Sequence, residues 1–259
     1  MPSNWRSSQS LSSYLAENTI LGIEGIDTRA LTKHLRSRGA MRACVTTELD
    51  TTDAIKAAKF SPSMVGMDYV KEVSTEQSYV WNEESRLWTL PNEMADEIGY
   101  YRDLPAIRHR IIAYDFGLKY NILRRLRQTG FEVEVVNART TASEVLAKKP
   151  GGLFLSNGPG DLAALGYVHS EIRSLLGKLP IFGICLGNQI LAHAYGGKTF
   201  KLKFGHRGGN QPVKDLRTGK ISITSQNHGF AVDPDSLPAE IEVTHINLND
   251  GTVEGMRHR

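Results

Sequence analysis

The segment best suited to chemistry is Pro180-Ile-Phe-Gly-Ile-Cys-Leu-Gly-Asn-Gln189, in which Cys185 follows an apolar run and precedes an expected helix. Gly183 and Gly187 lie two residues to either side, which is the spacing of a nucleophile elbow, where small neighbours permit a sharp strand-to-helix turn. The helix N-terminus would favour the thiolate over the thiol, and backbone N–H groups, Leu186 first, could stabilise an oxyanion. Cys185 is therefore a candidate nucleophile. The alternative is a small buried hydrophobic residue, as most lone cysteines are.

A second glycine-rich turn, Leu155-Ser-Asn-Gly-Pro-Gly-Asp161, follows the preceding expected strand. Its N–H groups could bind a carbonyl or carboxylate group of a substrate. The alternative is a tight turn that needs glycine for a positive φ. Because the carboxyl ends of parallel strands meet at one edge of a sheet, we expect both turns to face the same crevice.

The elements that must position these turns follow from the alternation of apolar runs and amphipathic segments after residue 108. Such repetition predicts an α/β fold with a doubly wound, mostly parallel sheet. From Lys198 onward the pattern changes to short strands, at 221–224, 242–245 and 252–256. The expected strands of the first part are 110–115, 132–136, 153–156 and 181–184, and the expected helices are 121–128, 142–148, 167–176 and 186–195.

We expect three parts along the chain: a partial N-terminal α/β domain over 1–72, an irregular connection over 73–108, and the doubly wound domain over 109–259. In the first part, a helix begins at Ser12 or Ser13, and another is capped by Asp27 or Thr28 and stops at Gly39. Residues 42–47 have the β-branched and apolar character of a strand, and residues 51–59 predict a short helix.

Composition excludes several classes of protein. The chain has 259 residues, 40% hydrophobic and 23% charged, which is typical of a globular protein and excludes a disordered one. The net charge of +3 comes from scattered basic residues, so nucleic acid is not an expected partner. The stretch 179–197 is too interrupted by polar residues to span a membrane, and the N-terminus does not resemble a secretory signal, so we expect a cytoplasmic protein. Two distant cysteines, Cys44 and Cys185, suggest neither a disulfide framework nor a metal site.

The motifs resemble those of a known family. Gly183-Ile-Cys-Leu-Gly-Asn-Gln189, Ser156-Asn-Gly-Pro-Gly-Asp161 and Ser225-Gln-Asn-His-Gly-Phe230 look like class I, or triad, glutamine amidotransferases, whose domain is flavodoxin-like. More narrowly, the chain resembles the small subunits of carbamoyl-phosphate synthase. Segments that support this narrower match are Ile26-Asp-Thr-Arg-Ala-Leu-Thr32, Ala113-Tyr-Asp-Phe-Gly-Leu-Lys119 and Lys203-Phe-Gly-His-Arg-Gly-Gly-Asn210.

The resemblance implies hydrolysis of L-glutamine through a thioester on Cys185. Ammonia would pass to a large subunit, in a heterodimer or a higher oligomer, for carbamoyl phosphate synthesis in arginine and pyrimidine biosynthesis. The large subunit would use ATP and Mg, so this chain is expected to need no cofactor or metal of its own. Leu186 and Gly160 are expected at the oxyanion position. The expected glutamine pocket consists of Gly158, Gln189, Asn227, Gly229 and Phe230.

The sequence also departs from the family. A His-Pro-Glu motif, whose His would be the general base and whose Glu would orient it, does not occur in these residues. About a hundred family residues before the region matching 10–32 have no counterpart, so we expect a fragment that lacks both ends. His258 is too early for the base, and His206 and His228 are expected to be structural members of their loops. Alternatives are a catalytically incomplete scaffold or binding subunit, and a hydrolase or peptidase on the same elbow.

Overall fold

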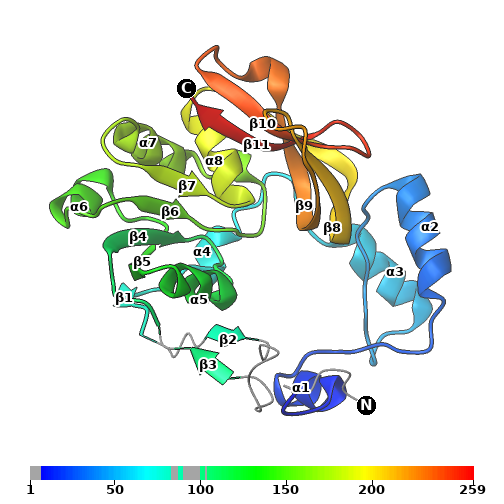
Figure 1. The fold of residues 1–259 in the computed structure, drawn as a ribbon. Coiled ribbons are helices and arrows are strands. Elements are labelled where there is room, and N and C mark those ends of the chain that lie inside the picture. The colour runs from blue at the N-terminus through cyan, green and yellow to red at the C-terminus, as the bar shows by residue number, and fades with distance from the viewer. Residues whose placement is uncertain (1–6, 83–86, 90–99, 103) are drawn as a thin grey trace. The chain divides into compact units, whose positions relative to one another are not determined.

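The structure, a computed structural model, describes residues 7–82, 87–89, 100–102 and 104–259 (Figure 1). The chain divides into a first unit, Met1–Ser63, and a second, Met64–Arg259. The first division therefore falls at Ser63, whereas the boundaries that the sequence suggested at residues 72 and 108 stay predictions. Both turns of chemical interest lie in the second unit.

The second unit contains a five-stranded sheet in the order β1-β5-β4-β6-β7. Its strands are β1 (Tyr79–Val80), β4 (His109–Asp115), β5 (Phe131–Asn137), β6 (Leu153–Leu155) and β7 (Ile181–Gly183). The pairs β4–β5, β4–β6 and β6–β7 are parallel, and β1 runs antiparallel to β5. This is the predicted mostly parallel sheet. Because β4, β6 and β7 are parallel neighbours, the loops after them open at one edge.

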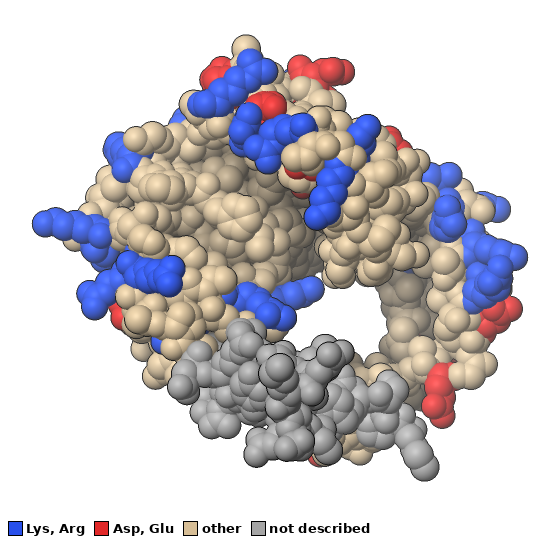
Figure 2. Space-filling model, in the orientation of Figure 1, with Lys and Arg blue, Asp and Glu red and all other residues tan. Residues whose placement is uncertain are grey.

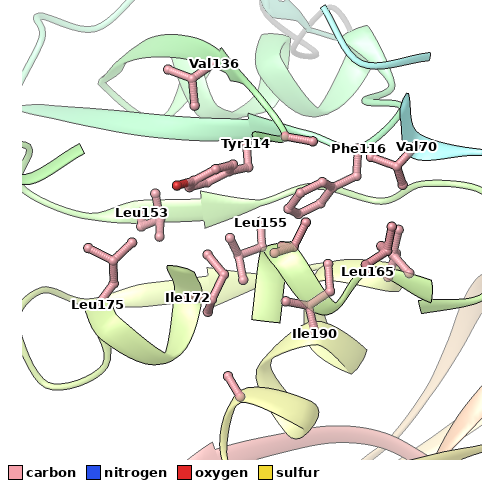
Figure 3. Close-up of a cluster of buried hydrophobic side chains, with 14 of the residues drawn as sticks. Val70, Tyr114, Phe116, Val136, Leu153, Leu155, Leu165, Ile172, Leu175 and Ile190 are labelled. Atoms are coloured by element: carbon pink, nitrogen blue, oxygen red, sulfur yellow. The ribbon is translucent and has the colours of Figure 1, made fainter. Parts of the chain in front are cut away.

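Helices cover both faces of this sheet, so each face has its own core. They are α5 (Tyr120–Gln128), α6 (Ala142–Ala147), α7 (Gly166–Leu175) and α8 (Leu186–Ala194), with a short 3-10 turn, η1 (Leu162–Ala164). Tyr114 and Leu155 from the sheet pack with Ile172 of α7 and Ile190 of α8 on one face (Figure 3). Leu123 of α5 and strand residues form the core of the other face. The arrangement is the doubly wound one that the alternation predicted.

Local sequence explains where these helices begin and end. Thr141 and Glu144 form a capping box at α6: the Thr141 hydroxyl accepts from the Glu144 N–H, and the Glu144 carboxylate accepts from the Thr141 N–H. Helix α5 ends at Gln128, and Gly130 follows with a φ of 94°, a conformation that favours glycine. Predicted and observed bounds in the parallel-sheet region differ by no more than a residue or so.

After α8 the chain forms four antiparallel strands that close into a barrel in the order β10-β11-β9-β8. They are β8 (Lys198–Asp215), β9 (Ile221–Asp233), β10 (Ile241–Asn247) and β11 (Val253–His258), with the 3-10 turn η2 (Pro234–Ser236) between β9 and β10. The change of pattern was predicted, but the lengths of β8 and β9 were not. Polar, glycine-containing segments continue as strand here because β8 and β9 pair with each other over most of their length, although the register shifts between Lys201 and His206.

Residues 64–81 pack against the sheet of the second unit. Val70 of α4 (Val70–Val73) is fully buried in one core, and Trp81 lies in the other. The Asp115 carboxylate accepts hydrogen bonds from the backbone N–H groups of Thr75, Gly117 and Leu118, which fixes this segment on the end of β4. Within the connection expected over 73–108, residues 83–86, 90–99 and 103 lie outside the described residues. The described part contains β1, β2 (Leu87–Thr89) and β3 (Tyr100–Arg102), which pairs with β2.

The first unit is helical where it is regular, with α1 (Leu11–Glu17), α2 (Thr28–Arg38) and α3 (Thr51–Phe60). As predicted, Asp27 caps α2 and Gly39 ends it. The expected strand over 42–47 is wrong: these residues are irregular. A strand needs a hydrogen-bonded neighbour, and no described strand pairs with this segment, so its β propensity is not realised.

Two surface properties bear on the expected class of protein. Among the described residues, no helix combines the length and apolarity that crossing a membrane requires. On the face drawn in Figure 2, Lys and Arg side chains stand in separate groups among uncharged residues.

Candidate active site

Cys185 occupies the sharp turn between β7 and α8, with φ 55° and ψ −111°. A non-glycine residue in this region of φ typically costs about 1–3 kcal/mol, so the surrounding packing must enforce it. The two flanking glycines provide that packing. A Cβ atom on Gly183 would lie 2.4 Å from the Gly187 carbonyl carbon. The structure thus contains the elbow geometry that the glycine spacing indicated.

The Cys185 thiol is half-buried and lies among backbone polar groups. Its Sγ is 3.9 Å from the Asn227 carbonyl oxygen. Burial raises the pKa of this thiol above its ordinary value. Hydrogen bonds from the backbone N–H groups of Leu186 and Gly158 act to lower the pKa, but their effect is smaller. These donors act in the direction expected of the helix N-terminus, towards the thiolate, but the loss of hydration outweighs them.

The glycine-rich turn after β6 lies beside the elbow and is held tightly. A Cβ on Gly158 would lie 2.1 Å from the Phe116 carbonyl oxygen, so only glycine fits this contact. The Ser156 hydroxyl accepts from the Phe116 N–H at 2.9 Å and fixes the two loops together. Two backbone N–H groups donate to the Cys185 sulfur, that of Leu186 and that of Gly158. Gly160, which was expected there, has a φ of 93° and packs on the backbone of Met67.

Three residues of β9 form the wall opposite the elbow. Gln189 of α8 is buried, and its Nε2 donates to the Phe230 carbonyl oxygen at 2.8 Å, which joins the helix to β9. Arg207, the register partner of Asn227 on β8, donates to the Asn227 side-chain oxygen. Gly229 lies between Asn227 and the buried Phe230. The predicted pocket residues on β9 are therefore positioned by α8 and β8.

Behind this wall lies a polar cluster that joins three strands. Glu254 of β11 lies 3.0 Å from His206 Nδ1 and 3.4 Å from His228 Nε2, and Asp250 lies 2.8 Å from His206 Nε2. Burial acts to raise the pKa of Glu254, but its hydrogen-bonding partners, His228 first, lower it below the usual range. Burial acts to lower the pKa of His228, but the Glu254 side chain and the Phe230 carbonyl raise it.

A single cleft brings the predicted site residues together. It has a volume of about 1610 Å³ and runs from the glycine-rich turn, past the elbow, to the barrel strands. Every residue predicted for the catalytic and glutamine-binding site lines it: Gly158, Gly160, Cys185, Leu186, Gln189, Asn227, Gly229 and Phe230. Their individual roles stay predictions, but their placement around one cavity is what a shared substrate site requires.

The sequence did not point to three charged residues that line the cleft, Lys119, Arg207 and Glu254. Lys119 lowers and Glu254 raises the pKa of Cys185. Lys119 and Arg207 lie in segments that supported the family resemblance, but nothing in their spacing distinguished them from surface residues. Glu254 reaches the site only because β11 pairs back into the barrel.

The remaining described histidines lie away from the thiol or make other contacts. His258 stacks on Tyr195, with ring centroids 5.4 Å apart. His169 of α7 and His193 of α8 pack together, with ring centroids 4.9 Å apart. Three further histidines lie on other elements: His34 on α2, His109 at the start of β4, and His245 on β10.

Comparisons with known sequences give a consistent result. Residues 112–259 match the family "Glutamine amidotransferase class-I", and residues 1–45 match "Carbamoyl-phosphate synthase small chain, CPSase domain". The chain is 56% identical to the carbamoyl phosphate synthase small chain of Akkermansia muciniphila, over 99% of this chain and 66% of that protein. The corresponding protein of Rhodopirellula baltica is 52% identical, over 100% of this chain and 67% of the relative. The chloroplastic carbamoyl phosphate synthase small chain of Oryza sativa is 44% identical, over 99% of this chain and 56% of that protein.

The chain thus spans about two thirds of the length of the bacterial relatives that it matches. Among solved structures, a Thermoplasma acidophilum protein named for GMP synthase has a TM-score of 0.51 and 22% identity. The match covers 58% of this chain and 78% of that one. This likeness shows the fold alone.

Proposed function

Since the chain belongs to the class-I glutamine amidotransferases, and among them to the carbamoyl phosphate synthase small chains, we propose that it hydrolyses L-glutamine at Cys185. One observation carries the proposal: Cys185 stands at positive φ on an elbow, with the N–H groups of Leu186 and Gly158 directed at its sulfur. This arrangement suits attack on a carbonyl carbon, because both donors lie where negative charge would develop.

The reaction has two stages. The sulfur of Cys185 attacks the side-chain amide carbon of glutamine, the thiol proton goes to the departing nitrogen, and ammonia leaves as the C–N bond breaks. Water then attacks the resulting thioester, releasing glutamate and restoring the thiol. The Leu186 and Gly158 N–H groups would stabilise the oxyanion in both stages. Because burial raises the pKa of Cys185, the thiol needs a base when substrate binds.

The proposal extends to the whole protein. Ammonia passes to a carbamoyl-phosphate synthase large subunit, which uses ATP and Mg to make carbamoyl phosphate for arginine and pyrimidine biosynthesis in the cytoplasm. The names of the relatives support a large-subunit partner, because each of them is a small chain of carbamoyl phosphate synthase. This division of labour would place the phosphate chemistry in the partner.

A second function is an incomplete amidotransferase that acts as a scaffold or binding subunit. The observation that favours it is that burial raises the pKa of Cys185, as is typical of an unreactive buried cysteine. The two functions differ in whether Cys185 reacts selectively with a glutamine analogue.

The test is mass spectrometry of the full 259-residue chain after incubation with a diazo-ketone analogue of glutamine. We expect one adduct per chain, mapped to Cys185, formed more slowly when L-glutamine is present. Cys185→Ser should give no adduct. Cys44→Ser, which removes the other cysteine, should be labelled like the unmodified chain and serves as the matched control.

Two outcomes would contradict the proposal, provided that circular dichroism shows a folded chain. One is no adduct at Cys185. The other is labelling of Cys44 and Cys185 at similar rates without protection by glutamine, because this would reflect general thiol reactivity and not a glutamine pocket.

A further inference from the structure

In the polar cluster of His206, His228, Glu254 and Asp250, buried acceptor atoms face one another, and the proposed glutamine chemistry does not explain this. The side chains of Glu254 and His206 are 93% buried and that of His228 is 90% buried, so bulk water does not reach these atoms readily. His206, His228 and Glu254 lie on β8, β9 and β11, and Asp250 lies in the connection between β10 and β11.

The partners of His228 fix the position of its hydrogen. Its Nδ1 lies 2.8 Å from the Phe230 carbonyl oxygen, which can only accept, so Nδ1 carries the hydrogen. In the neutral ring, Nε2 then presents a lone pair. That lone pair faces Glu254 Oε2 at 3.4 Å, and Nε2 is buried without an aligned hydrogen bond.

The same reasoning applies to His206. Its Nε2 lies 2.8 Å from the Asp250 carboxylate, which accepts, so the lone pair of the neutral ring is on Nδ1. Nδ1 lies 3.0 Å from Glu254 Oε1. The Asn247 side-chain amide also donates here: its Nδ2 lies 3.3 Å from His206 Nδ1, 3.1 Å from Glu254 Oε1 and 3.4 Å from Gln211 Oε1, so its two hydrogens are shared among three acceptors.

Three electron-pair donors therefore converge, and the only hydrogens that the described side chains direct at them come from Asn247 Nδ2, at His206 Nδ1 and Glu254 Oε1. The side-chain atoms of His206, His228 and Glu254 lie within 4.8 Å of one another. His206 Nδ1 lies 3.0 Å from Glu254 Oε1, and His228 Nε2 lies 3.4 Å from the other carboxylate oxygen, Oε2. Both contacts are close to the separation of about 3.3 Å between ligand atoms around a tetrahedral zinc ion with bonds of about 2.0–2.1 Å. Asp250 and the Phe230 carbonyl hold the outer ring nitrogens, as a carboxylate or carbonyl commonly does behind a metal-bound histidine.

From this geometry we propose that His206 Nδ1, His228 Nε2 and the Glu254 carboxylate form a binding site for a divalent transition-metal ion, with Zn²⁺ the best match. Two imidazoles and a carboxylate are ligands that zinc accepts, and three protein ligands leave a fourth position for water. One dication would also balance the charges of Glu254 and Asp250. His228 and Glu254 line the cleft, which gives the ion a route in.

The site would bind zinc independently of glutamine hydrolysis, and it differs from the expectation that the chain needs no metal. Its structural effect would be to join β8, β9 and β11, and so to hold the strand that carries Asn227 and Phe230. The inference does not require that Cys185 be catalytic, so the two proposals can fail separately.

The test uses the full chain without a histidine tag, in a Cys185→Ser background so that the thiol cannot bind metal. After treatment with a chelator and its removal, ZnCl₂ is titrated calorimetrically, and bound zinc is measured after gel filtration. We expect about one zinc per chain. Glu254→Gln and His228→Gln should lower the affinity at least tenfold, whereas His109→Gln, which changes an exposed histidine on β4, should bind like the parent.

The absence of retained zinc in the folded parent would overturn the proposal, as would equal binding by Glu254→Gln. If either variant fails to fold, the parent alone decides. Co²⁺ should then give the visible absorption of a four-coordinate site, and zinc should shift the imidazole nitrogen resonances of His206 and His228 and not those of His109. Two histidines that are both doubly protonated at pH 7.5 and unaffected by zinc would show that protons, and not a metal, occupy the cluster.

Discussion

Leu155 and Gly187 meet so closely that a Cβ atom on Gly187 would lie 2.1 Å from the Leu155 carbonyl oxygen. The contact joins the end of β6 to the first turn of α8, the two elements that carry the glycine-rich turn and Cys185. The strained backbone of Cys185 is therefore held by a packing contact two residues away, and the contact depends on a glycine.

Replacing Gly187 with alanine should destabilise the second unit by at least about 2 kcal/mol, because the Leu155 backbone that a Cβ would meet cannot move aside cheaply. Gly166→Ala is the matched control, since a Cβ there meets nothing within 4 Å and the residue begins α7. Its effect should be less than about 1 kcal/mol. Urea denaturation followed by circular dichroism measures both, and similar stabilities would contradict the packing argument.

The reactivity of Cys185 towards iodoacetamide should rise about tenfold for each pH unit from 6 to 8 and should not level off below pH 9. The reason is that burial raises the pKa of this thiol, so the thiolate is the minor species throughout that range. Alkylation rates followed by peptide mass spectrometry, with Cys185→Ser to assign the signal, check this. A plateau near pH 7 would mean that the donors at the sulfur outweigh burial.

Replacing Gln189 with methionine should lower the free energy of unfolding by about 0.5–1.5 kcal/mol, because the Phe230 carbonyl oxygen would lose the hydrogen bond from Gln189 Nε2 but keep the one from His228 Nδ1. Glutamine should also protect the variant less against the diazo-ketone, since this bond positions β9. Asn188→Ala, on the same helix, provides the comparison. Unchanged stability in the methionine variant would show that the bond contributes little.

The stability of the second unit should fall as the pH is lowered from about 6.5 to about 4. Burial first, then the neighbouring His193 and Arg173, lower the pKa of His169 to about 4. The unfolded chain, with a pKa near 6.5, therefore binds this proton before the folded chain does, and folding loses about 1–3 kcal/mol across the window. His169→Phe should flatten that part of a stability–pH curve measured by urea denaturation. An equally steep curve would assign the dependence to other groups.

Glutamine turnover by residues 1–259, tested by themselves, should be at least about 10³-fold slower than that of the Akkermansia muciniphila small chain, although Cys185 is labelled. The His-Pro-Glu motif to which the family resemblance assigns the base does not occur in these residues, and loss of one member of a catalytic triad costs about 10⁴-fold or more. Coupled detection of released ammonia compares the two proteins. Similar turnover numbers would indicate that another group serves as the base.

The sequence was sufficient for the parallel-sheet region because its signals are local. Buried runs of apolar residues, capping residues such as Thr141, and glycines after helices each specify structure within a few positions. The same holds for the elbow, where Gly183 and Gly187 permit a turn that bulkier residues would block. The strand predicted over 42–47 was wrong because a strand is completed by its neighbour, which local propensity does not supply.

What only the tertiary structure decided are relationships between residues distant in sequence. Closure of the barrel brings Glu254 to His206 and His228, which are 48 and 26 positions earlier, and no spacing rule connects these three. The pKa of Cys185 also depends on the whole fold, because burial by several elements opposes the N–H groups that the local motif supplies. Local sequence therefore determined which residue stands on the elbow, while desolvation and long-range pairing determined its chemical environment.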